Sequence, residues 1–290
     1  MSLRARLSQP DILLAPGVFD ALTGLIAEQA GAQAVYLSGA AIAYTRFGRP
    51  DIGLVAMSEV ADTIAVLRDR IALPIVVDAD NGFGNALNVQ RTTRAFERMG
   101  ANALQFEDQT LPKRCGHLDG KTLVSAAEMV GKIAAACDAR SSEETLIIAR
   151  TDAISVEGFD AALDRAERYS EAGADMLFVE APQSMAQLRQ ISDSFADRLP
   201  LMANMVEGGK TPALTAQELQ ELGFSLVIFP GGIVRTLAAR AREYYGNLIA
   251  TGSNAGFRDR MFDFSALNDV IGTPEMLELG RRFEGRDDSD

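Results

Sequence analysis

Charged and polar side chains recur where short apolar runs of the sequence end. Asp78 and Asp80 follow one such run, and Glu107 and Glu180 each stand seven residues after a glycine. The full set at run ends is Ser38, Gly39, Asp78, Asp80, Glu107, Asp108, Arg150, Glu180 and Asn204. Burying carboxylates among apolar strands is costly unless they are paired or bound to a metal. Four carboxylates beside one arginine indicate a divalent cation, and oxygen ligands favour Mg²⁺ or Mn²⁺ over zinc. A structural salt-bridge network is the alternative.

A second reactive group is the segment Lys113–His117, which reads Lys-Arg-Cys-Gly-His and holds the only histidine of the chain. Cationic neighbours lower the pKa of a thiol and make it a proton donor or a nucleophile. We therefore expect a function for Cys115, although an isolated loop cysteine usually has none. Zinc is not indicated, because the segment lacks further cysteine or histidine partners.

These residues follow a repeated turn-and-strand unit. Glycines at positions 31, 100, 173 and 223 each end a helical pattern and precede a short apolar run, as expected for a helix cap before a buried strand. Four further runs give eight strand candidates, which start near residues 12, 34, 74, 103, 145, 176, 201 and 226. Eight alternating β and α units predict a (β/α)8 barrel, whose active site lies at the C-terminal strand ends. A doubly wound sheet is the alternative, because one sequence does not give the strand order.

One helix between strands has a clear start signal. Ser125 and Glu128 have the spacing of a capping box. The apolar face of the helix that follows is expected to carry Val130, Ile133 and Cys137.

Beyond Tyr245 the strand pattern stops. We predict a catalytic barrel domain over residues 1–245 and a C-terminal helical extension over 246–290. Its helices are expected near 262–270 and 274–283, before an acidic tail. Their apolar residues have no strand left to cover, and such patches usually mark an interface. We therefore expect a homo-oligomer, with a tetramer as its state.

Composition limits the class of protein. The 290 residues are 47% hydrophobic, as in packed globular proteins, and carry a net charge of −12. So acidic a surface repels phosphate backbones, which disfavours nucleic acid as a partner. No uncharged apolar run reaches the length of a membrane span, and residues 1–15 lack the pattern of a signal peptide. Two cysteines are too few for a disulfide framework and indicate a reducing compartment, so we expect the cytoplasm.

Several motifs resemble those of the phosphoenolpyruvate mutase/isocitrate lyase superfamily. They are residues 77–84 (Val-Asp-Ala-Asp-Asn-Gly-Phe-Gly), 107–109 (Glu-Asp-Gln), 112–117 (Pro-Lys-Arg-Cys-Gly-His) and 149–152 (Ala-Arg-Thr-Asp). The likeness covers essentially the whole chain, from Pro16–Asp20 to Asn204–Pro212. Residues 112–117 are the most specific, since they resemble the carbon–carbon lyases of the family, whereas the phosphoenolpyruvate mutases themselves lack the cysteine. Residues 204–212 are similar to the branch of 2,3-dimethylmalate lyase and carboxyphosphonoenolpyruvate mutase.

The resemblance implies a Mg²⁺-dependent barrel, usually a tetramer whose last helix is swapped between neighbouring subunits. Asp78, Asp80 and Glu107 would hold the metal directly or through water. The implied catalytic residues are Cys115, Lys113, His117, Arg150 and Glu180. Those implied for binding a di- or tricarboxylate substrate are Tyr36, Ser38, Gly39, Ala40, Asp51, Gly116, Asn204 and Arg235.

The activity implied is cleavage of a substituted 2-hydroxydicarboxylate, of the 2,3-dimethylmalate or 2-methylisocitrate type, into a 2-oxoacid and a carboxylic acid. Cys115 would protonate the carbanion carbon as general acid. The alternatives are a carboxyphosphonoenolpyruvate phosphonomutase, an oxaloacetate hydrolase or decarboxylase, and a non-catalytic binding barrel. The chain departs from the family at Arg49, where leucine is common, and at Gly231 and Gly232, where leucine and serine are common. Both departures lie at the expected pocket mouth and leave the substrate side chain open.

Overall fold

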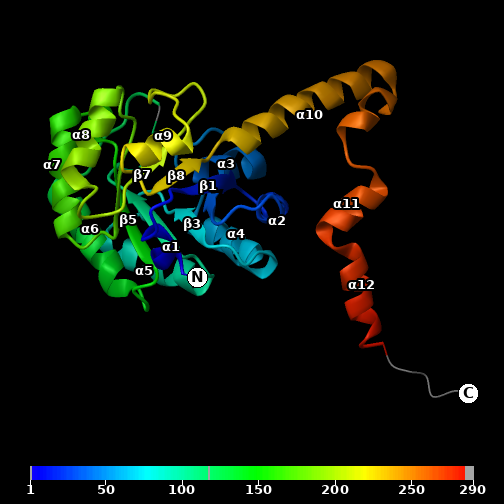
Figure 1. Ribbon diagram of the computed structural model, residues 1–290, viewed down its shortest axis with the longest axis horizontal. Helices are drawn as coiled ribbons and strands as arrows, with labels where there is room; N and C mark the ends of the chain where they lie inside the picture. Colours follow the sequence, from blue (N-terminus) through cyan, green and yellow to red (C-terminus); the bar gives the residue numbers. More distant parts are fainter. Residues whose placement is uncertain (1, 117, 285–290) are drawn as a thin grey trace, which may run out of the picture. The chain divides into compact units, whose positions relative to one another are not determined.

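Eight parallel strands form the centre of the first part of the chain (Figure 1). In the computed structural model, which describes residues 2–116 and 118–284, every strand lies where the sequence predicts one. The strands are β1 (Leu13–Val18), β2 (Val35–Leu37), β3 (Ile75–Asp78), β4 (Ala103–Glu107), β5 (Leu146–Thr151), β6 (Met176–Val179), β7 (Met202–Asn204) and β8 (Leu226–Phe229). Most are buried along their whole length, which explains why they read as continuous apolar runs.

The strands close into a barrel. Their order is β6-β5-β4-β3-β2-β1-β8-β7, and every registered pair is parallel. The two ends of this order meet at the β6–β7 seam through one parallel bridge, between Leu177 and Leu201. Closure with sequential neighbours excludes the doubly wound alternative and confirms the eight-stranded α/β barrel. β1 and the segment after β8 approach so closely that a Cβ on Gly17 would lie 2.3 Å from the carbonyl oxygen of Pro230.

Helices surround these strands (Figure 1). They are α2 (Ala21–Gln29), α3 (Gly39–Ile42), α4 (Met57–Arg70), α5 (Ala86–Arg98), α6 (Ala126–Ala139), α7 (Phe159–Glu171), α8 (Met185–Phe195) and α9 (Ala216–Glu221). Side chains that accept from free backbone N–H groups start several of them, such as Asp20 at α2, Asn85 at α5 and Thr215 at α9.

The predicted capping box of α6 is formed only in part. Ser125 Oγ accepts a hydrogen bond from Glu128 N at 3.1 Å. The Glu128 carboxylate is directed to Lys132 Nζ, 4.0 Å away, so it does not complete the box. The buried face of α6 is centred on Met129, Ile133 and Ala136, while Val130 and Cys137 lie half-buried at its border.

Strand alternation gives the barrel two apolar cores. The larger core lies between strands and helices. The second fills the barrel interior, where Leu3 and Leu7 of α1 (Leu3–Leu7) join residues near the beginnings of the strands, such as Leu13, Leu146 and Leu226. The N-terminal end of the barrel is therefore filled with apolar side chains, and the polar residues of the interior lie at the other end.

The chain continues into α10 (Gly232–Thr251), η3 (Ala255–Arg260), α11 (Phe264–Ile271) and α12 (Thr273–Arg281). The last two helices lie where the sequence predicts them. The described chain divides into two compact units between Val234 and Arg235, and α10 itself runs through residue 245. Whether the catalytic domain ends at residue 245 stays a prediction. Among the described residues no helix is both long and apolar enough to cross a membrane.

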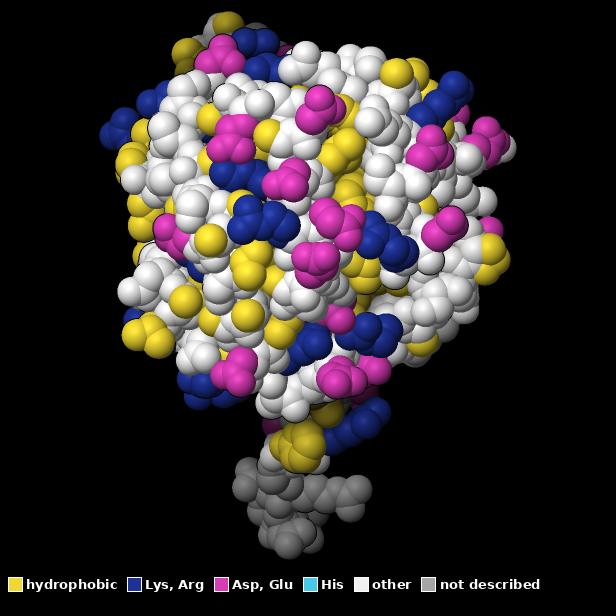
Figure 2. All heavy atoms as spheres, turned by 90° about the vertical axis from the view of Figure 1, so that its left-hand side faces the viewer, with side chains coloured by type: hydrophobic (Ala, Val, Ile, Leu, Met, Phe, Trp, Pro, Cys, Tyr) yellow, Lys and Arg dark blue, Asp and Glu magenta, His cyan; other side chains and the backbone are white. Residues whose placement is uncertain are grey.

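The face of the barrel that carries α7 and α8 is an ordinary solvated surface. Figure 2 shows acidic and basic side chains interspersed over it, with hydrophobic groups scattered between them. Exposed pairs such as Arg198 and Glu167 belong to this pattern, and such pairs contribute little to stability.

Candidate active site

Alternation along the strands brings the predicted site residues to one end of the barrel. Tyr36, Val76, Ile148, Phe178 and Met202 belong to the interior cluster. The residues two positions further on face the same interior, at or just beyond the C-terminal strand ends; they are Ser38, Asp78, Arg150, Glu180 and Asn204. Glu107 joins them, because β4 pairs it in register with Arg150. The structure thus brings these side chains to one level, and their roles stay predictions.

The densest charged cluster joins Asp51, Asp80 and Lys113. Lys113 Nζ lies 2.6 Å from Asp51 Oδ1 and 2.6 Å from Asp80 Oδ1. Burial raises the pKa of Asp80 to about 7, although the Lys113 ammonium acts against this. Burial lowers the pKa of Lys113, but the surrounding carboxylates outweigh it and hold that pKa well above its ordinary value. Lys113 is therefore a buried cation among carboxylates.

Backbone geometry fixes the aspartates of this cluster. Asp78 Oδ1 accepts a hydrogen bond from Asp80 N at 3.1 Å, and Asp80 adopts a left-handed φ of 47°. A Cβ on Gly39 would lie 3.2 Å from Asp78 Oδ2. Ser38 accepts from Ala41 N at 3.2 Å and so begins α3. Substrate binding by Ser38, Gly39 and the neighbouring Ala40 stays a prediction.

Glu107 and Arg150 face each other from neighbouring strands. Arg150 Nη1 lies 3.3 Å from Glu107 Oε2, while Glu107 Oε1 is buried and has no hydrogen-bond partner among the described residues. Burial raises the pKa of Glu107 well above its ordinary value, because desolvation outweighs the attraction of Arg150. An unpaired buried carboxylate oxygen is costly. It is a natural place for a ligand or a cation.

Asp152 anchors Arg150. Arg150 donates from Nε to Asp152 Oδ2 at 2.9 Å and from Nη2 to Oδ1 at 3.2 Å, and Lys121 Nζ donates to the same Oδ1 at 2.8 Å. Burial raises the pKa of Asp152, but the two cations outweigh it and bring the pKa down to about 2. The sequence analysis gave Asp152 no role, although its spacing from Arg150 was a usable signal. It missed Lys121, because the course of the loop is not visible in the sequence.

The Lys113–Gly116 loop lies directly on the site. A Cβ on Gly116 would lie 2.5 Å from Arg150 Nη2 and 2.5 Å from Glu180 Oε1, so the loop backbone can rest there only as glycine. The next residue, His117, lies outside the described part of the chain.

Cys115 is half-buried in this loop. Its backbone N–H donates to the carbonyl oxygen of Asp51 at 3.2 Å, which ties the loop to the segment after α3. Neither Cys115 nor Cys137 forms a disulfide. The predicted proton donor thus belongs to a loop that contacts the predicted site residues.

Two polar pairs complete the interior. Asn204 Nδ2 donates to Glu180 Oε1 at 3.2 Å and to Oε2 at 3.3 Å. Tyr36 OH donates to Gln105 Oε1 at 2.9 Å. Within the part of the chain that the structure describes, Asn204 Oδ1 and Gln105 Nε2 have no hydrogen-bond partner. Burial raises the pKa of Tyr36 well above its ordinary value, so the hydroxyl keeps its proton. The sequence analysis missed Gln105, although a glutamine inside an apolar strand was a signal.

One residue grouped with the site at the sequence level lies elsewhere. Asp108 faces the helices rather than the interior, and its carboxylate accepts from Thr151 Oγ1, Asp152 N and Tyr169 OH. Arg235 is the first residue of the second compact unit, so its predicted role as an anchor stays a prediction.

The donor chemistry suits a hard cation. Asp78, Asp80 and Glu107 offer oxygen atoms only, and a cation would relieve both the unpaired Glu107 oxygen and the raised pKa values. Within residues 2–116 and 118–284, no three carboxylate, thiolate or imidazole groups converge into a complete metal-binding group. Mg²⁺ usually keeps several waters and takes one or two carboxylates. The residues therefore fit Mg²⁺ held partly through water.

A family model described as phosphoenolpyruvate phosphomutase matches residues 3–249. The chain belongs to the phosphoenolpyruvate mutase/isocitrate lyase superfamily. A 2-methylisocitrate lyase of Aeropyrum pernix is 44% identical over 272 residues, which cover 93% of this chain and 86% of the relative. A 2,3-dimethylmalate lyase of Eubacterium barkeri is 38% identical over 281 residues, 97% of this chain and 96% of the relative. The predicted superfamily is confirmed, and this member of it is a lyase.

Solved structures of the superfamily share the fold. A crystal structure of 2,3-dimethylmalate lyase superposes with a TM-score of 0.92 at 34% identity, covering 98% of this chain and 95% of the other. A phosphonopyruvate hydrolase in complex with oxalate and Mg²⁺ superposes with a TM-score of 0.87 at 27% identity, covering 98% of each chain. The fold of this chain thus matches that of solved superfamily members over nearly its whole length.

Proposed function

We propose that this lyase cleaves a 2-hydroxydicarboxylate substituted at C3, of the 2-methylisocitrate or 2,3-dimethylmalate type, into a 2-oxoacid and a carboxylic acid. The observation that carries the proposal is the Lys113–Gly116 loop, which contains Cys115 and whose residues Lys113 and Gly116 lie against buried carboxylates and Arg150. Relatives with both printed activities, at 44% and 38% identity, support the same class.

Asp78, Asp80 and Glu107 would hold Mg²⁺, directly or through water. The metal, when bound, would polarise the substrate's 2-hydroxyl oxygen as a Lewis acid. Lys113 offsets part of the negative charge of the cluster and pairs with both Asp80 and Asp51. Ser38, Gly39 and Ala40 would bind the carboxylate of the oxoacid half.

The cleavage needs one base and one acid. A base among the carboxylates around Lys113 takes the hydroxyl proton, C2 becomes a carbonyl carbon, and the C2–C3 bond breaks. The electron pair of that bond passes into the carboxylate attached to C3, as an enediolate stabilised by Arg150, Asn204 and His117. Cys115 then gives its thiol proton to C3. The proton taken by the base restores the thiol through solvent, so no net proton is consumed.

A substrate screen tests the proposal. We expect a set of malates varied at C2 and C3, with and without a third carboxylate, to release oxoacid in the presence of Mg²⁺. A one-to-one yield of oxoacid and carboxylic acid from one of them supports the lyase. Rearrangement of a phosphonate without cleavage, or oxalate release from oxaloacetate alone, would contradict it and favour the alternative activities.

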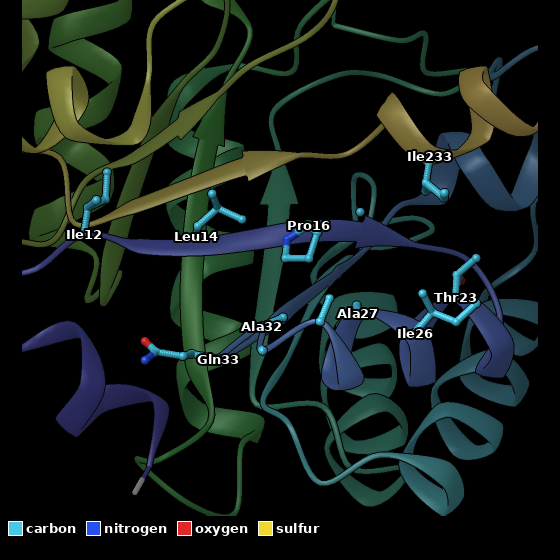
Figure 3. Close-up of a pocket in the computed structure, with 12 residues that line it drawn as sticks. Ile12, Leu14, Pro16, Thr23, Ile26, Ala27, Ala32, Gln33 and Ile233 are labelled. Carbon is cyan, nitrogen blue, oxygen red and sulfur yellow. The ribbon is translucent and has the colours of Figure 1, made fainter. Parts of the chain in front are cut away.

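The assembly we propose is a homotetramer with a helix swapped between subunits. Its support is an apolar hollow of about 530 Å³ on the outside of β1 (Figure 3). It is lined by Ile12, Leu14, Pro16, Gly17, Thr23, Ile26, Ala27, Ala30, Gly31, Ala32, Gln33 and Ile233. Helices cover the outside of a (β/α)8 barrel, so an apolar hollow at that surface is a place where a helix can pack. The exposed apolar residues of α11 and α12, such as Phe264 and Leu277, are a second uncovered surface.

Light scattering at micromolar concentration tests the assembly. We expect a tetramer, and dissociation when Leu14→Glu puts a charge into the hollow or when residues 255–290 are removed. Leu87→Glu, on the exposed surface of α5, is the matched control and should leave the tetramer intact. A wild-type monomer would contradict the proposal. We further propose that the enzyme works in the cytoplasm, because two cysteines are too few for a disulfide framework.

A further inference from the structure

The backbone on either side of Cys115 is held by buried side chains that the mechanism does not use. On the N-terminal side, Gln109 imitates a peptide group. Its Oε1 accepts from Arg114 N at 2.9 Å, and its Nε2 donates to Arg114 O at 2.8 Å. Gln109 is 1% exposed, so these bonds are shielded from water. Both backbone groups of the residue before the thiol are thereby fixed.

On the C-terminal side, Lys121 holds the residue after the thiol. Its ammonium donates to the carbonyl oxygen of Gly116 and, at 2.8 Å, to Asp152 Oδ1. The Lys121 side chain is 1% exposed and that of Asp152 is fully buried. Because Asp152 also anchors Arg150, Lys121 ties the loop to the group that fixes this arginine.

Gln109 and Lys121 stand on a rigid base. Gln109 forms an antiparallel bridge with Leu123, and Thr110 N donates to Thr122 O at 2.9 Å. The loop therefore leaves and re-enters the barrel on two short paired segments. From these segments the two side chains reach inward to the residues that flank Cys115.

We propose that Gln109 and Lys121 are positioning residues, which together clasp the Cys115 loop closed over the site. Restraint on both sides fixes the backbone from which the thiol projects, so its proton is presented from a fixed position. The effect on turnover rests on the proposed function, in which Cys115 is the proton donor. The clasp itself concerns the loop and is measurable without any substrate.

The test measures how fast the Cys115 thiol is alkylated by iodoacetamide. All variants carry Cys137→Ser, so that Cys115 is the only thiol. Gln109→Glu keeps the acceptor for Arg114 N but sets a carboxylate against Arg114 O, and Lys121→Met removes the ammonium while keeping the stem. Each should raise the alkylation rate about tenfold and lower kcat about tenfold, with little change in KM, as expected for losing one or two buried hydrogen bonds. Alkylation rates measured from pH 6 to 10 distinguish two causes of faster alkylation: easier access of the reagent to the thiol, and a change in the pKa of the thiol.

Two further variants calibrate the result. Lys121→Arg keeps donors for both partners and should restore slow alkylation and most of kcat. Lys210→Met, the matched control, removes an ammonium that pairs with Asp119 of the same loop at 2.9 Å near the surface. It should change both rates less than twofold.

Alkylation at the parental rate in folded Gln109→Glu and Lys121→Met would overturn the clasp. If Lys121→Met shows no cooperative thermal unfolding, Gln109→Glu alone decides, since it keeps size and shape. Wild-type turnover by Cys115→Ser would instead overturn the proposed function, while the alkylation rates still decide the clasp.

Discussion

Glu107 and Asp108 are adjacent and equally buried, yet their surroundings differ. Glu107 faces the barrel interior, where one carboxylate oxygen is unpaired and the other lies 3.3 Å from Arg150. Asp108 faces the helices, where it accepts hydrogen bonds from Thr151 Oγ1 at 2.7 Å and from Tyr169 OH at 2.8 Å. One step along a strand thus separates a carboxylate that lacks partners from one that has them.

The difference teaches how to tell a site from its support. A fully paired buried network makes the structure rigid, whereas a partly paired one marks a place where something else binds. The two are connected, because Asp108 also accepts from Asp152 N at 2.9 Å, and Asp152 anchors Arg150. The hydrogen-bonded network between strands and helices therefore supports the residues of the barrel interior that lack partners.

Removal of the metal should have the largest effect on the interior cluster. We expect EDTA to abolish activity and Mg²⁺ or Mn²⁺ to restore it, because Asp78, Asp80 and Glu107 would hold the cation that polarises the substrate. Calorimetry should show weaker Mg²⁺ binding to Asp80→Ala. Full activity after exhaustive chelation would refute the metal role, and unchanged Mg²⁺ affinity would remove Asp80 from the ligands.

Cys115→Ser should lower kcat by about 10²–10⁴-fold, the range of a lost general acid. Serine is similar in size but a much weaker acid, so Mg²⁺ affinity and the thermal midpoint should barely change. Cys137→Ser is the internal control. Its thiol donates to Gly173 O at 3.3 Å far from the loop, so the substitution should cost some stability and leave kcat nearly intact. Wild-type turnover by Cys115→Ser would contradict the lyase mechanism.

Replacing each of the two adjacent carboxylates by an amide should affect stability and activity differently. Asp108→Asn sets an NH₂ group against the hydroxyls of Thr151 and Tyr169, so we expect it to lower the free energy of unfolding by about 3–5 kcal/mol. Glu107→Gln removes a costly buried charge and should change the same quantity by less than about 1 kcal/mol while abolishing activity. Urea unfolding of the metal-free protein measures both. If both variants lost the same free energy of unfolding, Glu107 and Asp108 could not be distinguished as a site residue and a supporting residue.

Acid should weaken the Asp152 anchor by a smaller amount. The pKa of this carboxyl is about 2 when folded and 3.8 ordinarily, so its contribution is present above pH 4 and is lost as pH falls through 2. The shift corresponds to about 2 kcal/mol. We expect the gap in unfolding free energy between wild type and Asp152→Asn to narrow from pH 6 to pH 3. A gap independent of pH would show that Asp152 is not the titrating group.

The sequence predicts the barrel because each strand is a compact apolar run, and four of the eight begin shortly after a helix-ending glycine. It also predicts which strand ends carry Asp78, Glu107, Arg150 and Glu180, since parallel strands bring their C-terminal ends together. It does not predict that Asp108 turns away. Consecutive residues of an extended chain point to opposite faces of the sheet, and the sequence shows only that the two acids are adjacent.

The loop contacts could not be predicted for a different reason. Gln109 and Lys121 act on Arg114 and Gly116 only after the chain between them has folded back, and no periodicity signals such a turn. The capping box of α6 is incomplete for a related reason, because Lys132 competes for Glu128 once the helix has formed. The predicted domain boundary at residue 245 does not coincide with the end of a helix, because α10 continues through residues 232–251.

Among the described residues, the parallel bridge between Leu177 and Leu201 closes the barrel between β6 and β7. Glu180 follows one edge of that seam and Asn204 ends the other, and hydrogen bonds of 3.2 and 3.3 Å span the gap between them. Backbone amides exchange hydrogen for deuterium when strands separate locally. Because this seam has fewer strand–strand contacts, we expect its amides to exchange first within the sheet. A substrate bound as proposed would contact both side chains and hold the two edges of the seam together. We therefore expect the backbone amide of Leu177 to exchange more slowly when the site is occupied.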